Sequence, residues 1–569
     1  MEYNTTTIDS PQSGLRGLLH AATSTNLSAT SIVGSLFALL VLYMVIDGLF
    51  TGRPDPRFEL FGVEKSDWLR FQAKLRFAQR GPEIVKEALD KAKGGIPQVI
   101  GLTGPIVILP MKYLDEVRNH PDLSLKGISM TDFHTHLPGF DVLKKSDRYD
   151  IVEEVVRGKI TRSLAQITKP VNEENTIVID ELFPQFTEWR ETKFAYAAQR
   201  MAAQVSSRIF LGAPLCRNKE WLDISVNFTV HFFGAAVLMR MFPKLLRPVM
   251  NWILPPCYQL RRSVRTGTRL INEEMARKRA LAASSSATTD KKSLDALQWM
   301  EDIAAGRPYD YGAGQLLLSF VSIHTTSMTL MQLLYDVVDN LEYIPRIRQE
   351  IIDVVREDGG WEKSTLSKLK LLDSCMKESQ RLSLLTVRKL KPFPYPCPPS
   401  APSLSKKRMR PLSPKPNPET DYHVFVHPVP MTRITTRPIT LSDGTFLPSH
   451  TRIGMSASHM HSPTHFPHPT TFIGDRFLHL RSQPGKESLY SFASPSPDHV
   501  GFGYGQHACP GRFFAGNEIK LMFAHLVMKY EWRFGEGGRP RNGNFGTELA
   551  PDMEAKVFFK ARKSEVGFG

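Results

Sequence analysis

The chain has 569 residues, of which 41% are hydrophobic and 23% charged, so it can form a large core and is not a disordered chain. Lys and Arg outnumber Asp and Glu by 72 to 57, a formal charge of +15, but there is no zinc-finger spacing or aromatic-glycine RNA signature, and nucleic acid is not an expected partner. The five cysteines are scattered and without C-x-x-C spacing, which disfavours a disulfide scaffold or a zinc site and indicates a reducing compartment. They are Cys216, Cys257, Cys375, Cys397 and Cys509.

An apolar segment with the length of a membrane span lies near the N-terminus. Residues 31–50 carry one charge, Asp47, close to their end, and about 20 apolar residues suffice to cross the hydrocarbon core. A cleaved secretory signal is the alternative, but about thirty mostly polar residues precede the segment, with Arg16 as their cation. We therefore predict one transmembrane helix over 31–50.

The charges on either side of this helix predict its orientation. Arg53 and Arg57 follow the span, so the positive-inside rule puts the body of the chain in the cytosol and residues 1–30 in the lumen. Asn4 and Asn26 are then accessible acceptors for glycosylation. A single-pass protein of the endoplasmic reticulum membrane is expected, with residues 51–58 as a Pro-rich hinge.

The body of the chain, 59–569, is predicted to have a mainly α (α+β) fold with a small strand-rich part. From 59 to about 387, apolar residues recur at three- and four-residue spacing, and 314–340 is a long apolar helix candidate. After Ile439 the pattern changes to short strands and turns, with one more helix from about 510 to 529.

Residues 388–438 do not fit this plan. They contain thirteen prolines, ten Lys or Arg and two Asp or Glu. Proline at this density prevents helices and sheet ladders, so a disordered or extended surface insertion is predicted. An unspliced intron in the gene model and a genuine low-complexity insertion are both open explanations.

The segment 502–511, FGYGQHACPG, places Cys509 after a glycine-rich loop and before an apolar helix. A thiolate is a strong ligand for iron, and a helix N-terminus lowers the proton affinity of a thiol. The glycines let the backbone lie close to a flat cofactor, Phe502 can cover the sulfur, and His507 can reach an anionic cofactor edge. A glycine-rich turn with a buried free cysteine is the alternative.

The whole segment resembles the haem-ligand signature of the cytochrome P450 family, with His507 in place of the usual Arg. The resemblance implies a helical cytochrome P450-like fold and haem b with Cys509 as its axial thiolate. Further similarity around 382–383 and 438–444 is typical of fungal members in secondary metabolism.

Three more motifs follow the family's order. Glu378 and Arg381 match its Glu-x-x-Arg pair, and Arg476 matches a segment in which Gly474 replaces the family's Pro. The resemblance implies a buried Glu378–Arg381–Arg476 cluster that braces the haem loop.

In the long helix, Thr325 aligns with the family's hydroxyl that helps to deliver protons to dioxygen, and His324 stands where the acid is usual. Val321 and Ser322 replace the family's small pair. A bond from the Thr325 hydroxyl to the preceding turn is the alternative. An imidazole, with an ordinary pKa of about 6.5, can shuttle a proton, so a proton relay through Thr325 and His324 is predicted.

Haem propionates require cations. Arg157 matches the arginine of the family's Trp-x-x-x-Arg motif, although Glu153 stands at the Trp position. Arg388 and Arg437 are further candidates. The substrate-facing lining is expected near 133–140, 228–241 and 320–325.

The predicted protein is a membrane-anchored haem-thiolate monooxygenase that oxidises a lipophilic small molecule, such as a terpenoid or an alkaloid, with O2. The resemblance implies electrons from NADPH through a separate cytochrome reductase, because no dinucleotide loop or flavin domain is present. Two alternatives stay open: a reductase-independent rearrangement or dehydration enzyme, and a non-catalytic haem protein inactivated by the insertion.

Overall fold

The structure is a computed structural model that describes residues 53–64, 67, 71–240, 242, 244–284, 294–383, 429–540, 543–545, 548–550 and 552–568, together with 34, 35, 38, 42 and 43. The predicted transmembrane helix 31–50 and residues 388–428 of the predicted insertion therefore lie largely or wholly outside the described residues. Pro54–Gly569 forms one compact unit.

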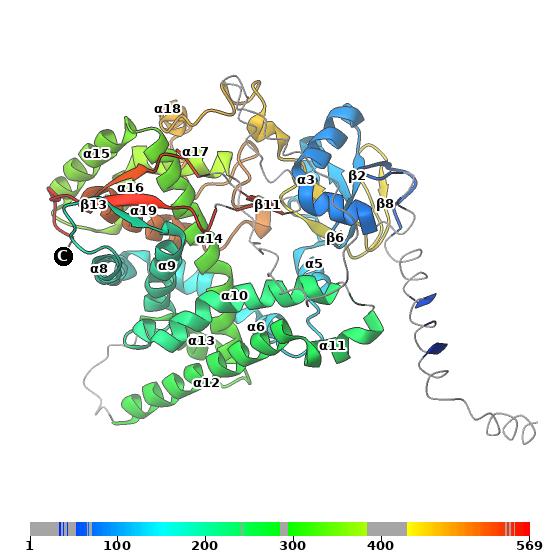
Figure 1. The fold of residues 1–569 in the computed structure, drawn as a ribbon, viewed down its shortest axis with the longest axis horizontal. Coiled ribbons are helices and arrows are strands. Elements are labelled where there is room, and N and C mark those ends of the chain that lie inside the picture. Colours follow the sequence, from blue (N-terminus) through cyan, green and yellow to red (C-terminus); the bar gives the residue numbers. More distant parts are fainter. Residues whose placement is uncertain are drawn as a thin grey trace, which may run out of the picture. The chain divides into compact units, whose positions relative to one another are not determined.

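Helices make up most of this unit, and short strands make up a smaller part (Figure 1). The prediction of a mainly α fold with a small strand-rich part is confirmed. The α-helices are α3 (Phe71–Ala92), α4 (Leu114–Val117), α5 (Leu125–Asp132), α6 (Val142–Ser146), α7 (Ile151–Glu154), α8 (Leu164–Leu182), α9 (Phe194–Phe210), α10 (Lys219–Arg240), α11 (Arg247–Ile253), α12 (Pro255–Ser284), α13 (Ala296–Ala304), α14 (Tyr311–Asp339), α15 (Tyr343–Asp358), α16 (Lys363–Lys368), α17 (Lys370–Leu382), α18 (Arg476–Arg481) and α19 (Arg512–Lys529). The strands are β1 (Glu59–Phe61), β2 (Pro97–Gly101), β3 (Gly104–Leu109), β4 (Leu123–Ser124), β5 (Arg190–Thr192), β6 (Arg433–Thr435), β7 (Ile439–Thr440), β8 (Phe446–Leu447), β9 (Arg452–Met455), β10 (Tyr530–Phe534), β11 (Gly543–Phe545), β12 (Glu548–Ala550) and β13 (Val557–Ala561).

The largest sheet joins segments from both halves of the chain. Its strand order is β1-β2-β3-β9-β6-β4, so the early strands β2 and β3 continue into β9 and β6, which follow the undescribed residues 384–428. Val107 lies opposite Ile453, and Ile434 lies opposite Arg452. Figure 1 shows this meeting of blue and yellow strands near β2 and β6.

The position of β6 changes the expected extent of the insertion. Arg433–Thr435 belong to the proline-rich segment predicted to end at Pro438, yet all three residues are buried in the sheet. β6 pairs with both β4 and β9, which the prolines Pro430 and Pro438 permit because they flank the strand. The described chain therefore resumes at Val429, and β6 is a buried strand within the range 388–438 that was predicted for the insertion.

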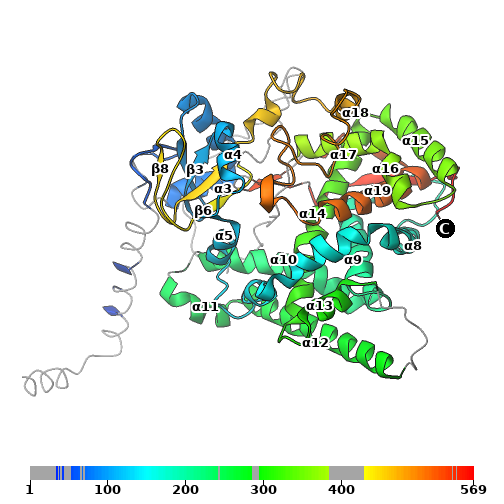
Figure 2. The same ribbon diagram turned by 180° about the vertical axis from the view of Figure 1, so that it is seen from behind.

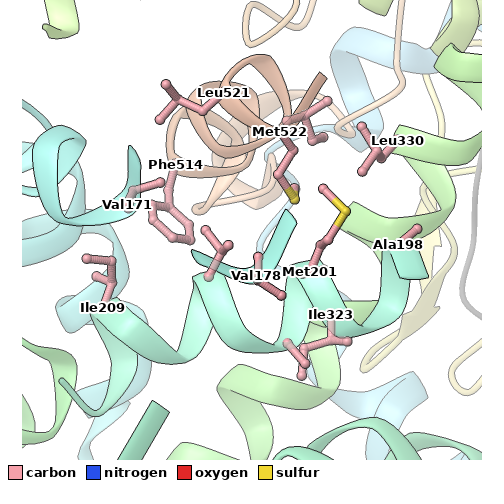
Figure 3. Close-up of a cluster of buried hydrophobic side chains, with 14 of the residues drawn as sticks. Val171, Val178, Ala198, Met201, Ile209, Ile323, Leu330, Phe514, Leu521 and Met522 are labelled. Carbon is pink, nitrogen blue, oxygen red and sulfur yellow. The ribbon is translucent and has the colours of Figure 1, made fainter. Parts of the chain in front are cut away.

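The helical core is built where α8, α9, α14 and α19 meet. Figure 3 shows their apolar side chains pointing toward one another, among them Met201, Ile323 and Phe514. All three are at least 94% buried. Seen from behind in Figure 2, α9 and α14 lie beside α19, so this core carries the helix that follows Cys509.

Local signals set the ends of the long helices. Asp310 caps α14, because its Oδ1 accepts a hydrogen bond from the Ala313 N–H at 2.9 Å. α15 ends at Gly359, whose φ of 71° is a left-handed conformation that glycine adopts without strain.

Two described helices, α10 and α14, have the length and apolar composition of a membrane span. Most of each is buried inside the protein, 56% and 78% of the most apolar stretch, as expected for core helices.

Glu518 is one of the acidic side chains buried among these helices. Glu518, on α19, is 1% exposed, and its Oε1 accepts a hydrogen bond from the Ser206 hydroxyl at 2.7 Å. Burial raises the pKa of this carboxyl to about 8, more than the Ser206 hydrogen bond lowers it.

We expect Glu518 to make folding stability depend on pH. The carboxyl binds more protons in the folded than in the unfolded protein between about pH 4.5 and pH 8, so its contribution is complete below that window and is lost as the pH rises through it. The slope is at most about 1.4 kcal/mol per pH unit. Urea unfolding from pH 4 to pH 9 should show this fall relative to E518Q, and equal pH profiles for the two proteins would contradict it.

Candidate functional site

The loop before α19 has a conformation that depends on its glycines. Gly503 and Gly505 have φ of 71° and 79°, and a Cβ at Gly505 would lie 2.8 Å from the backbone oxygen of Arg118. The Cys509 N–H donates to the Phe502 carbonyl at 2.8 Å, which closes the loop. The loop therefore presents Cys509 immediately before α19 begins at Arg512.

The sulfur of Cys509 lies in an environment with opposing effects on its ionisation. Burial raises the pKa of the thiol, and the backbone N–H groups of Gly511 and Arg512, with the nearby Arg512 guanidinium, lower it. The burial effect is the larger, but the lowering groups are those that would stabilise a thiolate. The residue is partly exposed, whereas the described cysteines Cys216, Cys257 and Cys375 are fully buried.

Phe502 lies at the side of this loop. Its ring packs edge-on against the ring of Phe492, with 5.1 Å between the centroids. Phe492 is 1% exposed and Phe502 is half-buried, so an inner aromatic ring supports the outer one.

The structure brings Glu378, Arg381 and Arg476 together. Arg381 donates to both Glu378 oxygens at 2.8 and 2.9 Å, and Arg476 Nε donates to Glu378 Oε1 at 3.0 Å. The side chains of Glu378 and Arg381 are completely buried. Two arginines thus share one buried carboxylate.

The remaining hydrogen bonds of this cluster go to one segment. Arg381 donates to the carbonyls of Met460 and Pro469, both at 2.7 Å, and Arg476 donates to that of Pro467 at 2.6 Å. Among the described residues, no hydrogen bond joins the cluster to 500–511. The cluster therefore fixes the chain before α18, not the Cys509 loop directly.

In the middle of α14, Thr325 faces the more open side of the helix. Its hydroxyl donates to the Val321 carbonyl at 2.8 Å and lies 3.1 Å from that of Ser322, so it bonds back to the preceding turn. Val321 is 49% exposed although most of α14 is buried. The lone pairs of the Thr325 oxygen stay available to accept a hydrogen bond.

His324 points to a different neighbour. Its Nε2 lies 2.9 Å from the Val226 carbonyl on α10, and its Nδ1 is 3.5 Å from the Gln199 amide on α9. The side chain is buried, and burial lowers the pKa of the imidazole, so the ring is neutral near pH 7. Proton transfer through His324 would require the ring to leave the Val226 carbonyl.

Arg157 and His507 both lie beside the Cys509 loop. Arg157, in the π-helix η3 (Val155–Ile160), donates to the Gln506 carbonyl at 2.7 Å and pairs with Glu153 at 3.1 Å. Half of its side chain is exposed. Burial and the positive charges of Arg433 and Arg157 lower the pKa of His507, with Glu153 acting against them.

Arg433 was missed in the sequence because it lies within the segment assigned to the insertion. It is 3% exposed on β6, and burial lowers its pKa to about 10. Its Nη1 donates to the Thr432 carbonyl at 2.7 Å, whereas its Nε has no hydrogen-bond partner among the described residues. The described chain also has no carboxylate within ion-pair distance of it. The β-branched residues Thr432, Ile434, Thr435 and Thr436, which lie between Pro430 and Pro438, were the available signal for a strand.

The other arginines considered from the sequence are placed differently. The side chain of Arg437 is 82% exposed and lies 4.0 Å from Asp122. Arg388 lies outside the described residues.

Aromatic side chains from the predicted lining segments meet in one cluster. Phe320 on α14 stacks on Phe233 at 5.2 Å and meets Phe232 edge-on at 5.0 Å, and Phe133 contacts both α10 rings. The three segments named from the sequence are thus neighbours in space, as expected of parts of one apolar wall.

Comparison with known proteins identifies the family of the chain. The cytochrome P450 family model matches residues 144–391 and 424–552, leaving 392–423 unmatched between them. Cytochrome P450 monooxygenase adrA of Penicillium rubens is 34% identical over 514 residues, 89% of this chain and 91% of its own length. Cytochrome P450 monooxygenase trt6 of Aspergillus terreus is 34% identical over 497 residues, 87% of this chain and 92% of its own length. The structure of retinoic acid-bound cyanobacterial CYP120A1 has a TM-score of 0.58 at 15% identity, covering 86% of this chain and 96% of its own.

The fold and the curated relatives define a haem-thiolate enzyme. The chain belongs to the cytochrome P450 family and is a monooxygenase of the type found in these fungal relatives. The family and the fold imply haem with an axial cysteine thiolate.

The residues present fit this cofactor. Cys509 combines a soft sulfur with backbone N–H groups directed at it. The buried Arg433 is a cation for which the described chain supplies no carboxylate, and Arg433 and Arg157 both lie near enough to His507 for their charges to lower its pKa. Thiolate on one side and cations at the edge are what a haem with two propionates requires.

Proposed function

We propose that Cys509 is the axial ligand of the haem and that the protein oxidises a lipophilic small molecule in secondary metabolism. The observation that carries this assignment is the position of Cys509. It lies immediately before α19, where the backbone N–H groups of Gly511 and Arg512 are directed at its sulfur. Relatives that align with this chain over most of their own length are named as monooxygenases, which supports this class of enzyme.

When bound, haem supplies the activation of dioxygen, and the protein supplies binding, orientation and control of protons. Cys509 would hold the iron through its ionised sulfur, and the N–H groups of Gly511 and Arg512 would favour that charge. Phe502, backed by Phe492, limits the access of water to the sulfur. A drier thiolate with fixed N–H partners keeps its ligation stable.

Arg433 and Arg157, whose charges both act on His507, are proposed to bind the propionates. The proposal for Arg433 is supported by its burial with no carboxylate of the described residues beside it, because an uncompensated buried cation is costly and is expected to have an anionic partner. Arg437 is too exposed to be favoured for this role.

We expect Arg433→Met to change haem retention and apoprotein stability in opposite directions. Loss of a charge-assisted hydrogen bond, about 1.5–3 kcal/mol, should speed haem loss about 10–100-fold. Removal of a desolvated cation should leave the apoprotein as stable as the wild type or more stable. Haem transfer to apomyoglobin and urea unfolding measure the two effects.

Arg437→Met is the matched control for this experiment. Because Arg437 is exposed, its replacement should leave both quantities unchanged. Equal haem loss from the two variants would remove Arg433 from the propionate site.

Thr325 is proposed to take part in proton delivery on the distal side. Its hydroxyl already donates to α14 carbonyls, so its oxygen acts by accepting a hydrogen bond and holding a proton donor in place. His324 is proposed to act with Thr325, and its contact with the Val226 carbonyl also holds α14 against α10.

The substrate is proposed to lie against the aromatic wall of Phe320, Phe232 and Phe233. Large apolar rings packed against one another suit a lipophilic ring system, such as a terpenoid or an alkaloid. Electrons are proposed to come from NADPH through a separate reductase, and a membrane anchor at 31–50 would bring both proteins to one endoplasmic reticulum surface.

The experiment combines a spectrum with a turnover assay. The purified protein, reduced under carbon monoxide, should give the absorption band of thiolate-ligated haem, and an imidazole-type band or none would reject the ligand assignment. Product formation from candidate scaffolds should require NADPH and a reductase. Turnover without NADPH would instead establish the rearrangement or dehydration enzyme.

A further inference from the structure

Helix α17 has contacts beyond the Glu378 cluster. Lys377 is completely buried, and its Nζ donates to the carbonyls of Ser491 at 3.0 Å and Ser494 at 2.8 Å. No carboxylate of the described chain lies within ion-pair distance of it. Burial lowers the pKa of this ammonium to about 7, the negative charge of Asp373 acts in the opposite direction, and the two carbonyls accept its hydrogen bonds.

The segment that Lys377 holds supports the ring beside the sulfur. Phe492 lies between Ser491 and Ser494, and its N–H donates to Asp373 of α17 at 2.8 Å. Its ring packs on Phe502, whose carbonyl accepts the Cys509 N–H. Asp373 and Lys377, one helical turn apart on α17, thus hold the segment whose Phe492 ring packs against Phe502.

His499 provides a second connection to the same helix. Its Nε2 lies 3.1 Å from the Lys377 carbonyl, and its Nδ1 lies 3.4 Å from the Gly501 nitrogen. The ring must donate through Nε2 and accept through Nδ1, which is one neutral tautomer. It is 1% exposed, and burial keeps its pKa well below the ordinary value.

These contacts differ in target from those of the Glu378 cluster. The cluster bonds to the chain from Met460 to Ile473, whereas Lys377 and His499 bond α17 to 491–501, which leads into the Cys509 loop. Adjacent residues of one helix therefore hold two different segments.

We propose that Lys377 and His499 are positioning residues that hold the Cys509 loop against α17 and thereby keep the sulfur in place for iron. The cofactor part of this proposal rests on Cys509 being the ligand. The loop part does not, because the contacts exist in the chain itself.

The test compares H499F and K377M with the wild type in two measurements. In the haem-loaded, reduced protein under carbon monoxide, conversion from the thiolate-ligated band to another band should be about 10-fold faster or more in both variants, the usual cost of losing a residue behind a metal ligand. In the apoprotein, alkylation of the Cys509 peptide, followed by mass spectrometry, should be faster by a similar factor.

Two further variants separate positioning from general destabilisation. His525 is a matched control, because it is a fully buried histidine on α19 that bonds to Asn172 at 2.8 Å and has no described hydrogen bond to the loop. H525F should keep wild-type conversion and alkylation rates. H499Q retains an amide donor within reach of the Lys377 carbonyl and should restore most of the band's lifetime; if H499F does not accumulate, H499Q and K377M carry the test.

The outcomes are distinct. Wild-type rates in both H499F and K377M, or equal acceleration in H525F, would overturn the positioning role. If the wild type itself lacks the thiolate band while alkylation still accelerates in both variants, the ligand assignment fails and the loop role stands.

Discussion

Replacement of Cys509 by serine is expected to abolish the thiolate-ligated band and monooxygenase turnover together. A residue that only supports a metal ligand contributes about 10–100-fold to affinity or activity, so loss of the proposed ligand itself should exceed that range. A seryl oxygen is a harder donor that does not ionise near pH 7, and the N–H groups of Gly511 and Arg512 cannot compensate for this. Product analysis and the carbon monoxide difference spectrum measure both effects.

Cys257→Ser is the control for this change. Cys257 is fully buried on α12, where burial raises its pKa to about 11, so it is an unreactive core thiol. Its replacement should cost stability but leave the band position unchanged. A thiolate band that survives in C509S would assign the ligand to another cysteine and end the present proposal.

Replacement of Glu378 by glutamine is expected to prevent accumulation of the folded haem protein. The change removes the charge that Arg381 and Arg476 share and leaves two buried arginines uncompensated. Breaking a buried ion pair in this way costs about 3–5 kcal/mol, a large fraction of the roughly 5–15 kcal/mol that stabilises a folded protein. Urea unfolding and the haem content of the purified protein provide the measurement.

Glu174→Gln is a stringent comparison because Glu174 is also completely buried. Its partner Arg217 is 48% exposed and can turn toward water when the carboxylate is lost. We expect a loss of about 1–2 kcal/mol there. Equal losses of unfolding free energy in E378Q and E174Q would mean that sharing the carboxylate between two buried arginines does not increase the cost of removing its charge.

The chemistry of the site was predictable where it depends on neighbours in the chain. The glycines and Cys509 lie within one decapeptide, and Glu378 and Arg381 lie one turn apart on a helix, so spacing alone defines their local geometry. Arg476 is distant, and its place in the cluster came from the resemblance and agrees with the observed contacts. The mainly α fold followed from the three- and four-residue spacing of apolar side chains, which requires no long-range information.

Other features depended on contacts between distant segments. In the sequence, Arg433 lies within the proline-rich segment predicted as an insertion. In the structure, β6 pairs with β4 and β9, and this pairing buries the Arg433 guanidinium. The orientation of α14 about its own axis directs the His324 side chain to the Val226 carbonyl. The sequence alone cannot distinguish this direction from one toward Thr325.

The amino-acid sequence by itself thus determined the type of protein, its cofactor motif and its helical character, because each resides in short spacings that local backbone geometry reads directly. Only the tertiary structure decided that Arg433 is buried with no described carboxylate beside it, which way His324 turns, and that Lys377 and His499 join α17 to the chain before Cys509. These are properties of burial and hydrogen bonding between segments that are far apart in the chain, where the energy depends on the packed neighbours and not on the residue type alone.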